Sequence, residues 1–443
     1  MDNYYHQQEN EEHLLKRLLY YTKRARRLRY YEENDPSGED ANVQRLHRLC
    51  RGKPLFPCLR KLQSLVWPLS IAEANILLSP TLRGVDIGSM YAIPRTLCFK
   101  LAQVQQEQMC LQFLVKRCPD LRVFNCWKRM SSSRLLDPVF NLSQLESIEC
   151  HILQPTIPDR RGQWLEKASG MRRLIELRFF ALNLPDSLPL NMGPFTRLEL
   201  LEIIGSTPVL FSMFRSMCSN HLRSVSIRTD IGRQVGDWYS MKKCLQSLVD
   251  GSGERITQFY LDPNSLHDPL AVPPSSMFLP LAQARNMQQF TVNIPCVLQY
   301  DDIAIFAHAW PNLRSFGFSP SQTLVLRQGF DALIVLARFC PRLERIEICL
   351  DLSNPPTHDR SLTSNHSVLH LELSIPYLPP ADEDIREIAE HIHRLFPAMS
   401  TWFHPFEAAK NWSRVLAAVK ELKRQSKECI SEADTETDKY QKL

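Results

Sequence analysis

The chain has 443 residues, of which 44% are hydrophobic and 23% charged, so it can build a large core and is not a disordered protein. Its formal net charge of +5, from 53 basic and 48 acidic residues, indicates no particular acidic partner. Only 14 glycines stand against 30 prolines, which argues against the glycine-rich phosphate loops of nucleotide enzymes. No apolar run approaches the ~20 residues that cross a bilayer.

The cysteines indicate a reducing compartment. There are 13 of them, an odd number, with no C-x-x-C pair, and the N-terminal residues are polar rather than a signal peptide. We therefore expect free thiols and a cytoplasmic or nuclear protein.

The first predicted element is a basic helix over 14–30, within an N-terminal segment 1–33. Seven basic residues and no acidic one lie between Lys16 and Arg29. Three interpretations stay open: the helix docks on the next element through its leucines, it binds nucleic acid or an acidic membrane, or it contacts a protein. A hinge and a short helix are expected over 34–54.

A strand-like phrase, apolar-x-x-apolar-x-apolar, then recurs along the chain at a mean spacing of about 28 residues, close to the ~20–29 of leucine-rich repeats. It begins at Leu62, Leu82, Leu121, Leu145, Leu174, Leu198, Leu222, Ile256, Met287, Leu313, Leu343, Val368 and, weakly, Met399. We predict one strand from each phrase.

The segments between the phrases have helical spacing. The predicted helices cover 101–118, 209–217, 238–249, 303–309, 330–339 and 382–396. Four of them end on an apolar residue followed by proline, which stops a helix. Alternating strands and helices, neither of which buries its apolar face alone, predict an α/β solenoid over 55–404: a curved, mostly parallel inner sheet with helices outside.

The phrases in 55–67, 79–87, 118–127, 195–203 and 340–348 resemble the repeat region of fungal, mushroom-type F-box/leucine-rich-repeat proteins. Residues 14–30 resemble the helix that follows the F-box, and the segment around Trp412 and Val415 resembles the family's closing helix, which we place at 405–430 before an acidic tail, 431–443. In that family the F-box recruits a Skp-type adaptor and a cullin ubiquitin ligase, and the repeats hold the substrate.

Two departures from the family are visible. No F-box is recognisable, so a Skp-type adaptor is expected only if an F-box lies upstream. The consensus asparagine after each strand is nearly absent, with Asn264 alone in position, so no regular asparagine ladder is expected.

Residues with chemical potential have structural explanations. Cys118, Cys126, Cys150 and His151 fit no zinc-site spacing, and the last two cysteines fall on core positions. The acids at 301–302 and 382–384 stand at helix starts, where they stabilise the helix dipole. We therefore predict no enzyme, no metal and no cofactor. The predicted function is a protein–protein recognition module that binds an unknown protein on its concave face; the alternative is a nucleic-acid- or acidic-membrane-associated protein acting through the basic helix.

The predicted binding site follows from strand alternation, since the third, fifth and seventh positions of each phrase alternate with the buried ones and face the concave side. The site takes the fifth and seventh positions. In four adjacent repeats these are Asn125 and Trp127, Glu149 and His151, Arg178 and Phe180, and Glu202 and Ile204. Aromatic anchors among charged groups are typical of an interaction hot spot. Alternatively, Trp127 and Phe180 are covered by the long segments that follow their strands. The sequence leaves both alternatives open.

Overall fold

A computed structural model describes residues 13, 16–30, 41–64, 69–88, 101–130, 133–152, 163–181, 193, 195–217, 219–229, 237–263, 274–294, 296, 299–318, 329–352, 368–377, 382–399 and 413–425. Over these residues the strands form a 13-stranded sheet in which each strand follows the previous one in chain order. The pairings given below are parallel. This is the α/β leucine-rich-repeat solenoid that the recurring phrase predicts. The chain divides into two compact units, Met1–Leu222 and Arg223–Leu443.

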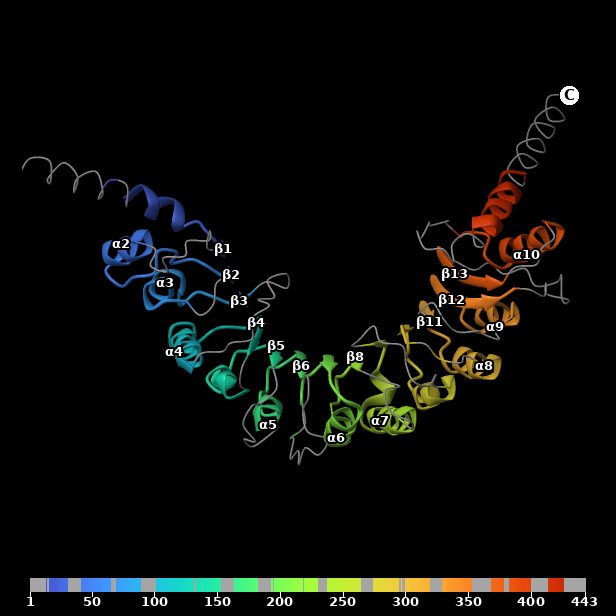
Figure 1. Ribbon diagram of the computed structural model, residues 1–443, viewed down its shortest axis with the longest axis horizontal. Coiled ribbons are helices and arrows are strands. Elements are labelled where there is room, and N and C mark those ends of the chain that lie inside the picture. Colours follow the sequence, from blue (N-terminus) through green and yellow to red (C-terminus); the bar gives the residue numbers. More distant parts are fainter. Residues whose placement is uncertain are drawn as a thin grey trace, which may run out of the picture. The chain divides into compact units, whose positions relative to one another are not determined.

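In unit 1 (Met1–Leu222) the described helices α3, α4 and α5 lie on one side of the strands (Figure 1). Its strands are β1 (Arg27–Tyr30), β2 (Lys61–Ser64), β3 (Gly84–Ile87), β4 (Val123–Met130), β5 (Ser147–Ile152), β6 (Glu176–Ala181) and β7 (Leu200–Ile204). Its helices are α2 (Ala41–Cys50), α3 (Ile71–Leu77), α4 (Leu101–Arg117), α5 (Gln163–Ser169) and α6 (Thr207–Ser216), with 3-10 turns η1 (Ser133–Leu136) and η2 (Val139–Asn141).

Unit 2 (Arg223–Leu443) repeats the alternation. Its strands are β8 (Ser224–Thr229), β9 (Gln258–Pro263), β10 (Gln289–Val292), β11 (Ser315–Phe318), β12 (Arg345–Asp351) and β13 (His370–Tyr377). Its helices are α7 (Asp237–Ser252), α8 (Tyr300–Ala309), α9 (Asp331–Phe339) and α10 (Asp382–Leu395), with η3 (Gly253–Arg255) and η4 (Ser275–Gln283). Residues 413–425 form a further helix.

The strand registers confirm most of the predicted phrases. Val85 pairs with Phe124, Phe124 with Ile148, and Ile148 with Leu177, so the second apolar position of each phrase forms one continuous row. In unit 2, Val225 pairs with Phe259 in the same way. These side chains are at most 1% exposed and pack between the sheet and the helices. The six predicted helices exist, with ends that shift by a few residues.

Two predictions about the first repeats are wrong. Residues 14–30 are not one helix: the helical residues end at 22, and Arg27–Tyr30 forms β1, which pairs with β2. The first phrase is also displaced by three residues, because Leu62 pairs with Val85 rather than with Leu82. The phrase therefore begins at Leu59, which is fully buried.

A turn of constant geometry precedes the strands. The N–H of the first phrase residue donates to the carbonyl three residues earlier, from Leu82 to Ser79 at 3.0 Å, from Leu121 to Cys118 at 3.2 Å and from Leu313 to Trp310 at 3.0 Å. The same bond joins Met399 to Phe396 at 3.2 Å, so the thirteenth phrase opens as predicted, but its Trp402 and His404 lie outside the described residues.

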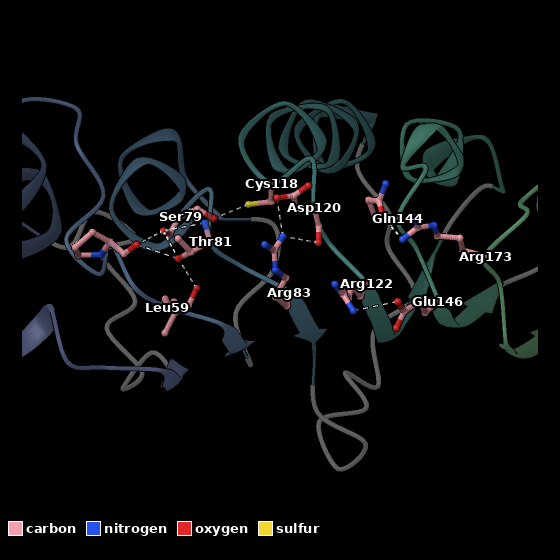
Figure 2. A network of polar contacts seen from close by, with 11 residues as sticks. Leu59, Ser79, Thr81, Arg83, Cys118, Asp120, Arg122, Gln144, Glu146 and Arg173 are labelled. Atoms are coloured by element: carbon pink, nitrogen blue, oxygen red, sulfur yellow. Dashed lines mark hydrogen bonds and ion pairs between the residues drawn. The ribbon is translucent and has the colours of Figure 1, made fainter.

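Side chains in this turn replace the asparagine ladder. Ser79 Oγ donates to the Pro57 carbonyl (3.0 Å) and Cys118 Sγ to the Ser79 carbonyl (3.3 Å), so each turn is tied to the preceding repeat (Figure 2). Ser219 Oγ to Leu198 O (2.9 Å) and Trp310 Nε1 to Leu281 O (3.2 Å) repeat the arrangement. A buried carbonyl needs such a partner, and hydroxyl, thiol and indole groups supply it here. Asn264 lies outside the described residues.

Candidate functional site

The predicted site residues lie side by side on the face of β4–β7 that carries no helix among the described residues, which we call the helix-free face. Alternation fixes the face: Phe179 packs edge-on against Trp164 of α5 with ring centroids 5.0 Å apart, so its neighbours Arg178 and Phe180 point the other way. Asn125, Glu149, Arg178 and Glu202 pair in register across the four strands and form what we call the polar row.

The polar row is linked by charge. Arg178 lies between Glu149 at 3.9 Å and Glu202 at 3.8 Å, with Glu176 also at 3.9 Å. These distances describe ion pairs rather than short hydrogen bonds. One cation, Arg178, therefore lies among three carboxylates, so carboxylates outnumber cations in these described contacts.

Sequence reasoning missed that the polar row extends into β3 and β2. Asn125 Nδ2 donates to Asp86 Oδ1 at 2.7 Å, and Lys61 Nζ lies 2.9 Å from Asp86 Oδ2. Asp86 occupies the fifth position of its own phrase, so the information was present in the sequence. Lys61 was hidden because the first phrase was placed three residues too late.

Glu149 has the most perturbed environment on this face. Its side chain is only 3% exposed, and desolvation raises its pKa to about 7, although Arg178 acts in the opposite direction. Glu202 and Asp86 add to the rise because they carry the same charge. A carboxyl group that titrates near neutrality can lose or gain its charge when a partner covers it.

Trp127, His151 and Phe180 form a second, parallel line that we call the aromatic row. His151 stacks on Phe180 with ring centroids 3.8 Å apart and planes at 19°, and Trp127 lies 5.8 Å from His151 at 44°. His151 and Phe180 are register partners, whereas a bulge between Cys126 and Arg129 displaces Trp127.

Exposure separates the members of the aromatic row. Trp127 is half-buried, but Phe180 and Ile204 are each only 8% exposed. The exposed-aromatic interpretation is therefore wrong for Phe180. Phe180 and Ile204 are buried members of this face, and Trp127 and His151 are its partly exposed aromatic groups.

The residues that suggested other chemistry have structural roles. Burial raises the pKa of Cys118 to about 12 and that of Cys150 further, so both thiols are protonated and act as small apolar groups. Asp302, near the start of α8, accepts a hydrogen bond from Ser275 Oγ. Among the described residues no group of three or more His, Cys, Asp or Glu side chains could hold a metal ion.

None of the helices in the described ranges is long and apolar enough to cross a membrane.

Comparison with known proteins gives structural neighbours but no relative by sequence. No protein-family model matches the chain, and no curated protein matches it. Rad7 in the yeast Rad7–Elc1 complex is similar over 71% of this chain and 74% of the other at 13% identity, with a TM-score of 0.34. The leucine-rich repeat-containing protein LegL7 of Legionella pneumophila is similar over 88% of this chain and 97% of its own at 11% identity, with a TM-score of 0.35. The fold assignment rests on the strands and turns described above.

Proposed function

We propose that the chain is a protein-recognition module, without catalytic activity, that binds its partner on the helix-free face of β4–β7. The observation that carries the proposal is the aromatic row: a half-exposed indole, Trp127, held at the end of a ring stack that is itself immobilised in the sheet. A rigid aromatic group loses little conformational freedom on binding, so most of its contact energy goes into affinity.

The polar row supplies orientation beside this anchor. Its charges are held by neighbouring strands before any partner arrives, through the contacts of Arg178 with Glu149 and Glu202. Preorganised charges favour one partner orientation and reject like-charged surfaces. The excess of carboxylates predicts that the bound segment of the partner is basic.

The test uses a photo-crosslinking amino acid at position 127, with the same group at Tyr239 as a matched control. Tyr239 is 60% exposed and lies on α7 of unit 2, so it is not part of β4–β7. We expect a protein that crosslinks from position 127 and not from position 239. Titration of that purified partner should then show that Trp127→Ala weakens binding by roughly fivefold or more, equivalent to ~1 kcal/mol.

Comparison with the Tyr239→Ala control decides whether this face binds the partner. If Trp127→Ala and Glu149→Gln bind the partner as tightly as Tyr239→Ala, the helix-free face of β4–β7 is not the binding surface.

We further propose that the bound protein is the substrate of a ubiquitin ligase; support for this role comes from the resemblance of the repeat phrases to F-box proteins. Because no F-box is recognisable, the purified chain should form no stoichiometric complex with a Skp-type adaptor in size-exclusion chromatography. A stable complex would show that the chain recruits the adaptor through a surface of its own.

A further inference from the structure

Over the described residues, the first strand, β1, has an open edge. It pairs with β2 and is the terminal strand of the sheet over the described residues. The N–H groups of Arg60 and Lys61 both donate to the Arg26 carbonyl, so residues 26, 28 and 30 direct their backbone groups toward β2. By the same alternation, the backbone N–H and C=O groups of Arg27 and Arg29 face the open edge, where a further strand would pair.

No described strand covers the apolar side of β1 at this edge. Leu28 and Tyr30 are only half-buried, whereas their register partners in β2, Leu62 and Ser64, are each 1% exposed. A further strand would cover Leu28 and Tyr30 in the same way that β1 covers Leu62 and Ser64.

The two described segments that form this edge are positively charged, and two acids of neighbouring elements contact them: Glu73 accepts a hydrogen bond from Tyr30, and Asp86 pairs with Lys61. Residues 16–30 contain seven Lys or Arg and residues 41–64 contain six, and neither range contains an Asp or Glu. On the helix-free side, Arg27 and Arg29 of β1 lie beside Lys61 and Gln63 of β2. Arg29 Nε donates to Gln63 at 3.0 Å, a neutral partner. The segment that pairs here should therefore carry acids at alternate positions, because alternate side chains of a strand share one face.

The chain itself contains such a segment near its C-terminus. Residues 432–438 read Glu-Ala-Asp-Thr-Glu-Thr-Asp, with acids at 432, 434, 436 and 438. In an extended strand all four carboxylates share one face, and Ala433, Thr435 and Thr437 share the other. Threonine is β-branched and favours strands.

We propose that residues 432–438 of a second copy of the chain add to β1 as a further strand. The carboxylates then face Arg27 and Arg29, while Ala433 and the threonines cover Leu28 and Tyr30. The pairing is β-strand addition, in which backbone hydrogen bonds give affinity and side chains give specificity.

A peptide titration tests the pairing directly. The receptor is the full-length chain with its own tail neutralised (Glu432→Gln, Asp434→Asn, Glu436→Gln, Asp438→Asn), and the probe is a fluorescent peptide of residues 430–440. We expect saturable binding at low salt that weakens as salt rises. The Arg27→Glu/Arg29→Glu receptor should bind roughly tenfold or more weakly, a loss of about 1.4 kcal/mol.

Matched controls separate strand addition from simple charge attraction. Arg172→Glu/Arg197→Glu changes the net charge equally at two exposed turn residues and should leave binding unchanged. A peptide with the four acids made consecutive, or with Thr435→Pro, should bind much more weakly, because the first loses the alternation and the second loses a backbone donor. A peptide with lysines at the four acid positions should regain binding to the Arg27→Glu/Arg29→Glu receptor, which shows that this receptor is folded.

The same interaction should appear in the intact protein. In sedimentation velocity the full-length chain should associate with rising concentration, and the tail-neutralised chain should not. Equal binding of the consecutive-acid and Thr435→Pro peptides would overturn the proposal, as would tighter binding of a single-stranded RNA than of the peptide. Concentration-independent sedimentation of the full-length chain would also overturn it.

Discussion

The imidazole of His151 stacks on the phenyl ring of Phe180, with centroids 3.8 Å apart, on a face of the sheet that carries no helix. Although no described helix covers this face, Phe180 is only 8% accessible. The aromatic row therefore has one buried member, Phe180, and two partly exposed members, His151 and Trp127.

This division predicts opposite effects for two alanine substitutions. Phe180→Ala should lower the free energy of unfolding by about 2–4 kcal/mol, because it removes a buried ring and leaves a cavity beside His151. Trp127→Ala should lower it by less than Phe180→Ala does, because the indole is only partly buried. Urea denaturation of both variants measures the difference. Equal losses would show that Trp127 is also part of the core.

The environment of Glu149 predicts a pH dependence of stability. Its pKa is raised from the ordinary 4.5 to about 7, so between these values the folded state binds a proton that the unfolded state has released. The contribution of Glu149 to stability is therefore greatest below pH 4.5 and falls as pH rises through 7, by on the order of 3 kcal/mol.

The Glu149→Gln variant isolates this effect. Glutamine does not titrate, so the stability of the variant lacks the pH-dependent contribution of the Glu149 carboxyl group. Wild type should therefore lose stability relative to the variant as pH rises from 5 to 8. Urea denaturation at several pH values measures the difference between the two proteins, in which the other titrating groups cancel. A constant difference over that range would show that Glu149 titrates at its ordinary pKa.

The side-chain hydrogen bonds that tie each turn to the preceding repeat predict a loss of stability when one of them is removed. Ser219 is fully buried, and its hydroxyl donates to the Leu198 carbonyl at 2.9 Å. Ser219→Ala leaves that acceptor without the hydroxyl and should cost about 1–2 kcal/mol. Ser315→Ala, at a half-buried strand position, is the control and should cost less than about 0.5 kcal/mol. Equal melting temperatures of the two variants would show that the Ser219 hydrogen bond does not stabilise the protein.

The C-terminal helix predicts a capping function for the last repeat. Val415 and Val419 are fully buried, and Lys423 Nζ donates to the Met399 carbonyl at the start of the last repeat phrase. Deletion of residues 405–443 should expose the apolar face of that repeat and cause aggregation or a clear fall in Tm. Deletion of 426–443 alone retains the helix and should leave Tm unchanged. If the longer deletion melts like wild type, the helix is not a cap.

The sequence by itself determined the repeating unit and the neighbours within the site. The phrases from Leu82 to Val368 could be placed because the apolar spacing and the preceding turn are both local, and the turn bond from Leu82 to Ser79 needs only four consecutive residues. Once the phrases are aligned, parallel pairing in chain order places Glu149 beside Arg178 and His151 beside Phe180.

Only the tertiary structure decided three further points. β1 reads as the end of a basic helix, and it is a strand because β2 supplies its hydrogen bonds. The sequence around Leu59 and Leu62 offers two phrase frames three residues apart, and pairing with β3 selects the first. The low exposure of Phe180 depends on packing between strands far apart in sequence. Partners and solvent access are properties of non-local contacts, so no local pattern of residues specifies them.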